Sequence, residues 1–359
     1  QLLADNNQPE DHIALRGELT YTARLIKQSP KTSQPLCLNS NATYLITGGL
    51  GALGLHTAKL MVDKGAKHLV LLSRSKPSED KLATINNLQQ QGTEITVVQA
   101  DICNTEKISQ IFEQLNNCKA PLKGIIHAAG IEIFQPIQQM ELTHLKQVMA
   151  AKVIGGWNLH QLTQNKQLDF FITFSSIAAV WGSTGQAHYG AANHFLDALV
   201  HYRQAKGLPS FSINWGPWAG GGLAKEDDLK ELSKRGVEPI SPQQGIAALE
   251  QLWNSGNPQT TVANINWSLF KQLYEIGGQK SLLAEIEIEA LEIPTSNSKQ
   301  NEFLVKLESV DERDRYDFLK TRIQTEVAKV LGLNEAQLPG FEEGFFDLGM
   351  DSLMAVDLN

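Results

Sequence analysis

Short apolar runs alternate with helical patterns between residues 44 and 267, and this alternation restricts the fold more than any other feature. Several runs are almost wholly apolar, which is typical of parallel strands buried on both faces. Strands that alternate with helices predict an α/β fold with a doubly wound parallel sheet. The seven expected strands are Thr43–Thr47, His68–Ser73, Glu94–Gln99, Gly124–His127, Phe170–Ser175, Ser210–Asn214 and Thr261–Ile265.

A glycine-rich turn follows the first expected strand and opens a helix. The spacing Gly49-x-Gly51-x-x-Gly54 matches the dinucleotide fingerprint of the Rossmann fold. Glycines there allow a tight turn and close approach of a pyrophosphate, and the helix N-terminus faces the phosphates. The spacing alone also fits an ordinary glycine-rich turn, but the strand–turn–helix context favours a nucleotide. The expected cofactor contacts are Thr47, Gly48, Gly49, Gly51, Leu53 and Gly54.

The second expected strand ends at Ser73-Arg74-Ser75, where NAD-specific sites carry an acid for the ribose 2′-hydroxyl. An arginine there suits a 2′-phosphate instead, so Ser73 and Arg74 predict NADPH. The alternative for Arg74 is a solvated surface side chain. Asp101, after the third expected strand, is a candidate contact of the adenine, and it could equally cap a helix.

Composition excludes several other classes of protein. The chain has 359 residues, a formal net charge of -8 and no basic block, so we expect neither a nucleic acid nor an anionic membrane as partner. The three cysteines lie far apart, which indicates reduced thiols in a cytoplasmic protein and no metal site. No apolar run approaches the roughly 20 residues of a membrane span, and no signal peptide is evident.

Four residues form a candidate reaction group: Ser176, Tyr189, Asn193 and Lys152. Ser176 follows the fifth expected strand, at the carboxyl edge where α/β sheets place ligands. Tyr189 and Asn193 are four apart at the start of a helix and share a face. A ketone reduced by hydride needs a proton, and a tyrosine of pKa about 10 needs a cation nearby to supply it at neutral pH. Lys152 can supply that charge, and Ser176 a hydrogen bond to the carbonyl oxygen. Taken singly, each residue also fits a structural role.

The run Phe174–Asn193 resembles the active-site segment of polyketide synthase ketoreductases. Most short-chain dehydrogenases carry Lys four residues after the Tyr and Asn on an earlier helix. Here Asn193 has the first place and Lys152 the second, an exchange typical of polyketide and animal fatty acid synthase ketoreductases. Two further segments resemble the family's cofactor motifs, His127–Gly130 and Asn214–Trp218. The resemblance covers roughly residues 10 to 290 and implies cofactor contacts from Ala128, Ala129, Gly130, Pro217 and Trp218.

The resemblance implies a reaction. NADPH would reduce a β-ketoacyl thioester on an acyl carrier protein, with Tyr189 as proton donor and Ser176 binding the oxyanion. Lys152 would lower the tyrosine pKa and orient the ribose, and Asn193 would hold Lys152 or a relay water. Two alternatives stay open: a reductase of a free metabolite, and a catalytically silent structural module.

Family markers of stereochemistry are also present. One product hand correlates with Leu-Asp-Asp shortly after the His-x-Ala-Gly segment, and here Glu132-Ile133-Phe134 stands instead. The other hand correlates with a Trp eight residues before the catalytic Tyr, where Trp181 stands. Gln186 is not the His that marks reduction of an epimerised α-substituent. The resemblance therefore implies an A-type ketoreductase, subtype A1, giving an L-β-hydroxyl.

The two ends of the chain carry further segments. Gly349–Leu353 resembles the phosphopantetheine attachment motif of acyl carrier proteins, with Ser352 as the attachment residue. His12–Lys27 predicts two short strands around Gly17-Glu18 and resembles the end of the structural subdomain that precedes these ketoreductases. We expect a piece of a longer synthase polypeptide, whose other domains would be partners. The expected parts are a structural remnant (1–43), the catalytic domain (44–293), a linker (294–313) and a truncated carrier domain (314–359).

Overall fold

The computed structural model describes residues 10, 12–29, 35–275, 279–288, 307, 309–311, 314–330 and 340. The chain divides into two compact units. The larger comprises residues 29–233 and 237–264 and contains the sheet predicted from the sequence. The smaller comprises residues 1–28, 234–236 and 265–359.

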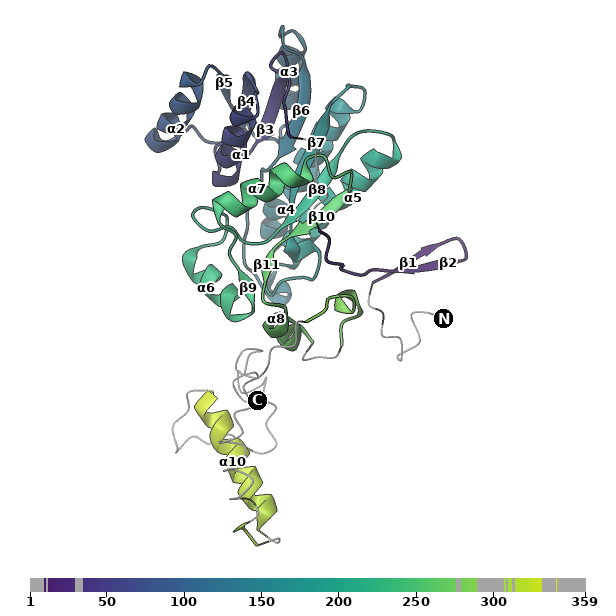
Figure 1. The fold of residues 1–359 in the computed structure, drawn as a ribbon, viewed down its shortest axis with the longest axis vertical. Coiled ribbons are helices and arrows are strands. Elements are labelled where there is room, and N and C mark those ends of the chain that lie inside the picture. The colour runs from purple at the N-terminus through teal and green to yellow at the C-terminus, as the bar shows by residue number, and fades with distance from the viewer. Residues whose placement is uncertain are drawn as a thin grey trace. The chain divides into compact units, whose positions relative to one another are not determined.

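A seven-stranded sheet forms the centre of the larger unit, and every pair of neighbouring strands is parallel (Figure 1). The strand order is β10-β8-β7-β6-β3-β4-β5. From β3 the chain adds strands on one side, β4 and then β5, and it then returns to place β6 on the other side of β3. The carboxyl ends of β3 and β6 therefore border the crevice where open α/β sheets bind ligands. The strands are β3 (Thr43–Thr47), β4 (His68–Ser73), β5 (Glu94–Gln99), β6 (Leu122–His127), β7 (Phe170–Ser176), β8 (Phe211–Trp215) and β10 (Gln259–Val262).

The last predicted strand, Thr261–Ile265, is wrong as a single element. The chain forms β10, which ends at Val262, and then β11 (Asn264–Ile265), which belongs to a separate two-stranded sheet with β9 (Val237–Glu238). The main-chain N–H of Gly216, just past the end of β8, donates to the Val262 carbonyl at 2.8 Å. That bond is the last rung of the β8–β10 ladder, so the apolar run continues beyond the point where pairing stops.

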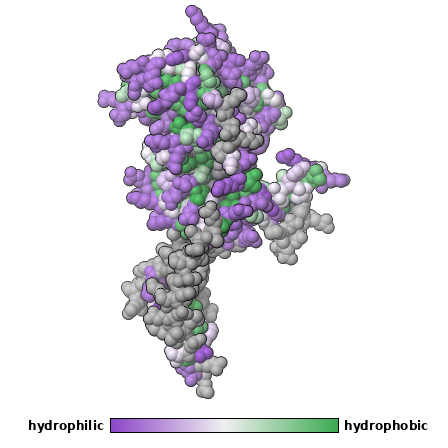
Figure 2. Space-filling view, viewed as in Figure 1, coloured by the Kyte–Doolittle hydropathy of each residue, from purple (hydrophilic) through white to green (hydrophobic). Residues whose placement is uncertain are grey.

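Helices cover both faces of the sheet (Figure 1). On one face, Met61, Ile85 and Leu249 join a buried cluster; on the other, Ile108 and Leu159 join a second. Hydrophilic residues dominate the visible surface of this unit, with apolar residues between them (Figure 2). The first face carries α1 (Ala52–Asp63), α2 (Glu79–Gln90) and α7 (Pro242–Leu252), and the second α3 (Thr105–Asn116), α4 (Leu142–Thr163) and α5 (Ala187–Ala205), which packs against α4. Shorter helices are η1 (Ile137–Gln139), η2 (Ile177–Ala179) and α6 (Glu226–Lys234).

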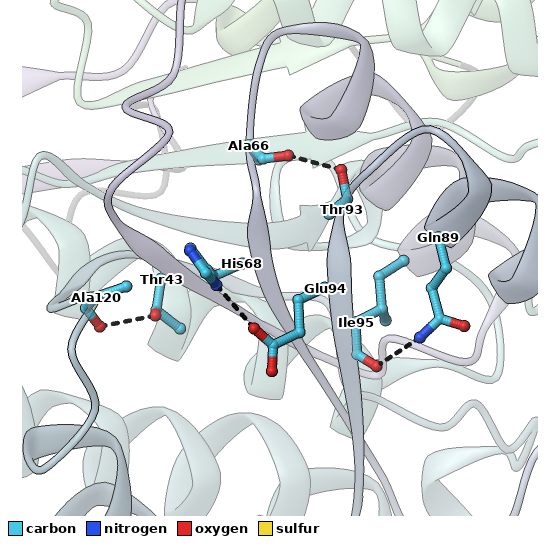
Figure 3. Close-up of polar contacts among 8 residues, drawn as sticks. All are labelled: Thr43, Ala66, His68, Gln89, Thr93, Glu94, Ile95 and Ala120. Atoms are coloured by element: carbon cyan, nitrogen blue, oxygen red, sulfur yellow. Dashed lines mark hydrogen bonds and ion pairs between the residues drawn. The ribbon is translucent and has the colours of Figure 1, made fainter.

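Polar side chains fasten the amino edge of the sheet (Figure 3). The Thr43 hydroxyl donates to the Ala120 carbonyl at 2.8 Å, and the Thr93 hydroxyl donates to the Ala66 carbonyl at 2.9 Å. On the same edge, His68 Nδ1 lies 3.1 Å from a Glu94 carboxylate oxygen. These contacts join neighbouring strands to one another and to the loops that precede them at this edge.

The smaller unit contains the two strands expected near the start of the chain. β1 (Ile13–Arg16) and β2 (Leu19–Thr22) pair antiparallel around Gly17, whose φ of 63° favours glycine. The unit also contains α8 (Trp267–Tyr274), η3 (Ser281–Leu283) and α10 (Arg315–Val330). Ser352 and the rest of its motif lie outside the described residues. None of the helices in the described part of the chain is long and apolar enough to cross a membrane.

Candidate active site at the carboxyl edge of the sheet

Thr47 and His127 join the two strands that border the crevice. They are register partners at the ends of β3 and β6, and the Thr47 hydroxyl lies 2.6 Å from His127 Nδ1. His127 Nε2 lies 3.1 Å from the Ala151 carbonyl, so the imidazole also reaches α4. Burial, and then the charge of Lys152, lowers the pKa of His127 to about 3. The imidazole is therefore neutral, and its two contacts link β3, β6 and α4 beside the crevice.

The glycine loop forms a cradle that only glycine backbone fits. Gly48 has a φ of 67°, and a Cβ there would lie 2.9 Å from main-chain atoms of Ala128 and Ala129. A Cβ on Gly54 would lie 2.4 Å from the Gly48 carbonyl oxygen. Gly51 is the N-cap of α1, and no side chain caps that helix. The first N–H groups of a helix have no acceptor within the helix, and next to a tight turn they can bind the pyrophosphate of a dinucleotide. Leu53 and Gly130 are half-buried beside this cradle.

Arg74 and Asp101 lie at the ends of two neighbouring strands. Arg74 directly follows β4 and is exposed, and its carbonyl accepts a hydrogen bond from Gln99 Nε2 at 3.0 Å. Asp101 follows β5, and one carboxylate oxygen accepts from the Cys103 N–H at 2.9 Å. The N-cap of α3 is Asn104, so Asp101 is not the helix cap that the sequence also allowed. Ser73, the last residue of β4, is half-buried.

The four residues of the candidate reaction group meet at this edge. Ser176 ends β7, Tyr189 and Asn193 lie on the first turns of α5, and Lys152 lies on α4. The Lys152 ammonium is 5.9 Å from the centre of the Tyr189 ring and donates to the Phe174 carbonyl at 2.9 Å. Asn193 Nδ2 donates to the Tyr189 carbonyl at 2.8 Å. Lys152, Tyr189 and Asn193 are all buried.

Burial dominates the electrostatics of this group. It raises the pKa of Tyr189 to about 12, and the charge of Glu132 acts in the same direction, while hydrogen bonds to Asn193 and Ser176 oppose both. Burial lowers the pKa of Lys152 to about 8, and the charge of Asp197 opposes that shift. We expected Lys152 to lower the tyrosine pKa; the structure shows the net shift to be upward. At neutral pH the tyrosine is protonated and the lysine is charged, which is the state a proton donor requires.

A buried polar network behind the group was missed by the sequence analysis. The carboxylate of Asp197, on α5, accepts from the Ser212 hydroxyl at 2.5 Å and from Asn214 Nδ2 at 2.8 Å. Asn214 Nδ2 also lies 3.0 Å from the Ser175 hydroxyl, which donates to the Asn193 carbonyl at 3.2 Å. The network thus ties β7 and β8 to the helix that carries Tyr189. Polar residues inside the apolar strand β8 were the signal available in the sequence.

Two aromatic residues named from the sequence are buried. Trp218 is buried, and its ring centre lies 5.1 Å from that of Trp215. The preceding Pro217 carbonyl accepts from the Ile240 N–H at 2.7 Å, which holds the loop after β8. Trp181 is buried at the end of the turn that follows Ser176, and its N–H donates to the Ile177 carbonyl at 3.2 Å.

Taken together, the sheet topology, the glycine cradle and the tyrosine–lysine pair define a reductase of the short-chain dehydrogenase type. Family models narrow this class. Residues 42–220 match the KR domain, and residues 321–359 match the phosphopantetheine attachment site. The chain therefore contains a ketoreductase domain and a phosphopantetheine attachment site, and it is homologous to modular polyketide synthases.

Relatives and solved structures agree with this assignment. The chain is 33% identical to the polyketide synthase GfsA of Streptomyces halstedii over 99% of its own length and 5% of that protein. It is 33% identical to the erythronolide synthase EryA3 of Saccharopolyspora erythraea over 97% of its length and 11% of that protein. A ketoreductase from the first module of phoslactomycin biosynthesis in Streptomyces sp. HK803 superposes with a TM-score of 0.75 at 32% identity, covering 80% of this chain and 66% of that one.

Proposed function

We propose that the chain reduces a β-ketoacyl thioester, carried on an acyl carrier protein, to an L-β-hydroxyacyl thioester with NADPH. The observation that carries this proposal is the meeting of Lys152, Tyr189, Asn193 and Ser176 beside the glycine cradle. The homology to modular polyketide synthases supports the substrate class, since those proteins hold acyl chains on carrier domains.

The chain's own residues fit NADPH. The cradle of Gly48, Gly51 and Gly54 would hold the pyrophosphate, and Arg74 would bind the 2′-phosphate because a guanidinium suits that anion. Ala128–Gly130 would form the opposite wall, with Pro217 and Trp218 beside the nicotinamide. When bound, NADPH supplies the hydride.

Proton transfer falls to Tyr189. As the substrate carbonyl carbon gains a hydride, its oxygen takes the phenolic proton of Tyr189, and C=O becomes CH–OH. The Ser176 hydroxyl would donate a hydrogen bond to that oxygen while charge develops on it. The carboxamide oxygen of Asn193 is buried and has no hydrogen-bond partner among the described residues. It can therefore accept a bond from Lys152 or from a relay water that returns a proton to Tyr189.

We infer the configuration of the product from the residues around the crevice. Trp181 is buried beside the turn that follows Ser176, and Glu132-Ile133-Phe134 stands where the family's other type carries Leu-Asp-Asp. A bulky indole on one side of the groove would make the pantetheine arm enter from the other side. We assign subtype A1 from the residues.

The test is reduction of a synthetic β-ketoacyl chain on a carrier protein, followed by chiral chromatography. We expect an L-hydroxy product. A predominantly D product would refute the A-type assignment, and NADPH binding without turnover would favour a silent structural module. Equal kcat/KM for a diffusible ketone would instead favour a reductase of free metabolites.

Ser352 would carry the phosphopantetheine, as the match of residues 321–359 supports. We propose the parts 1–43, 44–293, 294–313 and 314–359 as structural remnant, catalytic domain, linker and start of the carrier domain. The chain spans 5–11% of the length of the two curated relatives above, so the other domains of such a polypeptide are proposed partners. Incubation with a phosphopantetheinyl transferase should add one group, seen by mass spectrometry, and Ser352→Ala should abolish the addition.

A further inference from the structure

A carboxylate lies beside the candidate proton donor without a part in the mechanism above. It belongs to Glu132, in the loop after β6. On either side of it, Ile131 and Ile133 pack against the buried cluster of Val148, Ala178 and Tyr189. Glu132 is half-buried, and one of its carboxylate oxygens accepts a hydrogen bond from Gln186 Nε2. Gln186 is itself buried, so the pair is an internal contact rather than a surface one.

Main-chain contacts fasten the same two segments. The Gln135 N–H donates to the Gly185 carbonyl at 2.8 Å, and Gly185 has a φ of 71°. The Gln135 side-chain oxygen lies 2.8 Å from His144 Nδ1, on α4. The loop that contains Glu132 is therefore tied to the segment that leads into α5 and to α4. Such a loop can hold a charge in a fixed place.

The place is set by helix geometry. Gln186 is the N-cap of α5, and Tyr189 lies three residues later, in the first turn of the helix. The residues on either side of Glu132 pack against the cluster that contains Tyr189, and the Glu132 charge acts on the Tyr189 phenol. A negative charge in that position opposes ionisation of the phenol, because both groups would then be anionic in a poorly solvated site.

Other charged and titratable groups surround this pair. Lys152 on α4 faces the Tyr189 ring, and Asp228 on α6 acts on Glu132. His188, next to Tyr189, interacts with His144 on α4, and burial lowers the pKa of His188, which keeps it neutral. Lys152 alone among these groups favours a phenolate. Burial, the Asp228 charge and the Gln186 hydrogen bond all act on Glu132, and the net effect is a raised carboxyl pKa.

We propose that Glu132, held by Gln186, is a positioning residue that opposes ionisation of the Tyr189 phenol and fixes the loop of residues 131–135 against the start of α5. The proposal rests on the proposed function, in which Tyr189 gives its proton to the substrate. After the transfer, repulsion between the phenolate and the Glu132 carboxylate would favour return of a proton to Tyr189.

The direct test measures the phenol and not turnover. A trifluorotyrosine placed at position 189 ionises at a lower pH than tyrosine, and its ionisation can be followed by ¹⁹F NMR in the full chain. We expect Glu132→Gln to lower the measured pKa by about one unit, because a like charge is removed from its neighbourhood. Glu141→Gln is the matched control, since Glu141 is exposed at the start of α4 and its removal should leave the titration unchanged.

A second variant tests the holding role. Gln186→Leu keeps the carboxylate but removes its donor, so the pKa of the fluorinated phenol should shift, and hydrogen exchange at the Gln135 amide should become faster. If Glu132→Gln does not fold, this variant decides the question. An unchanged titration in the folded variant or variants overturns the proposal. The proposed function would be refuted by a different result. That result is normal turnover by Tyr189→Phe, whatever the titration shows.

Discussion

The two edges of the sheet use polar side chains in opposite ways. At the amino edge, Thr43 and Thr93 each donate to a main-chain carbonyl within 3 Å (Figure 3). At the carboxyl edge, burial raises the pKa of Tyr189 to about 12 and lowers that of Lys152 to about 8. The carboxamide oxygen of Asn193 is buried without a partner among the residues described. The two hydroxyls at the amino edge are thus paired with carbonyls, whereas the Asn193 oxygen at the carboxyl edge can accept a hydrogen bond from a ligand.

The difference separates stability from chemistry within one sheet. A buried ammonium costs free energy, since the folded protein holds it outside water. A buried hydroxyl bonded to a carbonyl stabilises modestly. Substitutions at the carboxyl edge should therefore lower turnover without a matching loss of stability, and those at the amino edge should lower stability without changing turnover.

The largest effect is expected at Tyr189. Tyr189→Phe keeps the ring and removes the proton donor, so reduction should fall roughly 10²- to 10⁴-fold while NADPH still binds. Tyr202→Phe is the control, because Tyr202 lies on the same helix and is 44% exposed. Steady-state kinetics and cofactor titration measure both. Near-normal turnover by Tyr189→Phe would mean that another group protonates the alkoxide.

Lys152 should show most directly that turnover and stability respond in opposite ways at the carboxyl edge. Lys152→Met should lower kcat by roughly 10²-fold, since the charge beside Tyr189 is lost. It should also raise the free energy of unfolding at pH 7. The native pKa of about 8 lies below the ordinary 10.5, and a gap of that size corresponds to roughly 3 kcal/mol. The gain should be smaller than this because the Phe174 carbonyl loses its donor.

The same shift predicts a pH dependence. Because the native pKa lies below that of the unfolded chain, the native lysine releases its proton first as the pH rises. Turnover should therefore fall above about pH 8, and Lys152 should make the free energy of unfolding increase between about pH 8 and pH 10.5. Urea unfolding of wild type and Lys152→Met across this window checks the sign. A gap between the two proteins that is independent of pH would contradict it.

Arg74 is expected to matter for the cofactor only. Loss of a charge-assisted contact to the 2′-phosphate should cost about 1.5–3 kcal/mol, or roughly 10- to 100-fold in kcat/KM with NADPH. The value with NADH should stay unchanged in Arg74→Ala. Lys76→Ala, two residues further and also exposed, is the matched control. Equal cofactor preference in wild type and variant would remove Arg74 from the site.

Sequence patterns predicted the fold well wherever burial alone decides it. The strands Thr43–Thr47, His68–Ser73 and Glu94–Gln99 agree with the structure at both ends. The run Thr261–Ile265 failed because hydrophobicity continues through Ala263 while the ladder to β8 stops at Val262. Apolar composition reports burial, and it does not report which strand supplies the hydrogen bonds.

The candidate site shows a similar limit. Lys152, Ser176, Tyr189 and Asn193 could be found because their residue types and spacing match one kind of chemistry. Glu132 and Asp197 could not, because their partners Gln186, Ser212 and Asn214 are 15 to 54 residues away in the chain. The direction of the Tyr189 pKa shift also depends on burial, which only the packed structure shows.

At the amino edge, Thr93 should affect stability alone. Thr93→Val keeps the shape of the side chain and removes the donor to the Ala66 carbonyl, at a cost of about 0.5–1.5 kcal/mol. The reduction rate should match wild type, because the residue lies at the edge opposite Tyr189. Urea unfolding followed by circular dichroism gives the first quantity and an NADPH assay the second. A changed kcat with unchanged stability would break the proposed division between the edges.

The smallest effect is expected for the pair His68–Glu94. The Glu94 side chain is 73% exposed, so water screens its attraction to the imidazole 3.1 Å away. Glu94→Gln keeps a hydrogen-bond acceptor and removes the charge, and we expect at most about 0.5 kcal/mol of lost stability, shrinking further as salt is added. Denaturant midpoints at low and high salt measure this. A loss above about 1.5 kcal/mol that persists at high salt would mean that the amino edge depends on a charge as the carboxyl edge does, and the contrast between the two edges would then be one of burial alone.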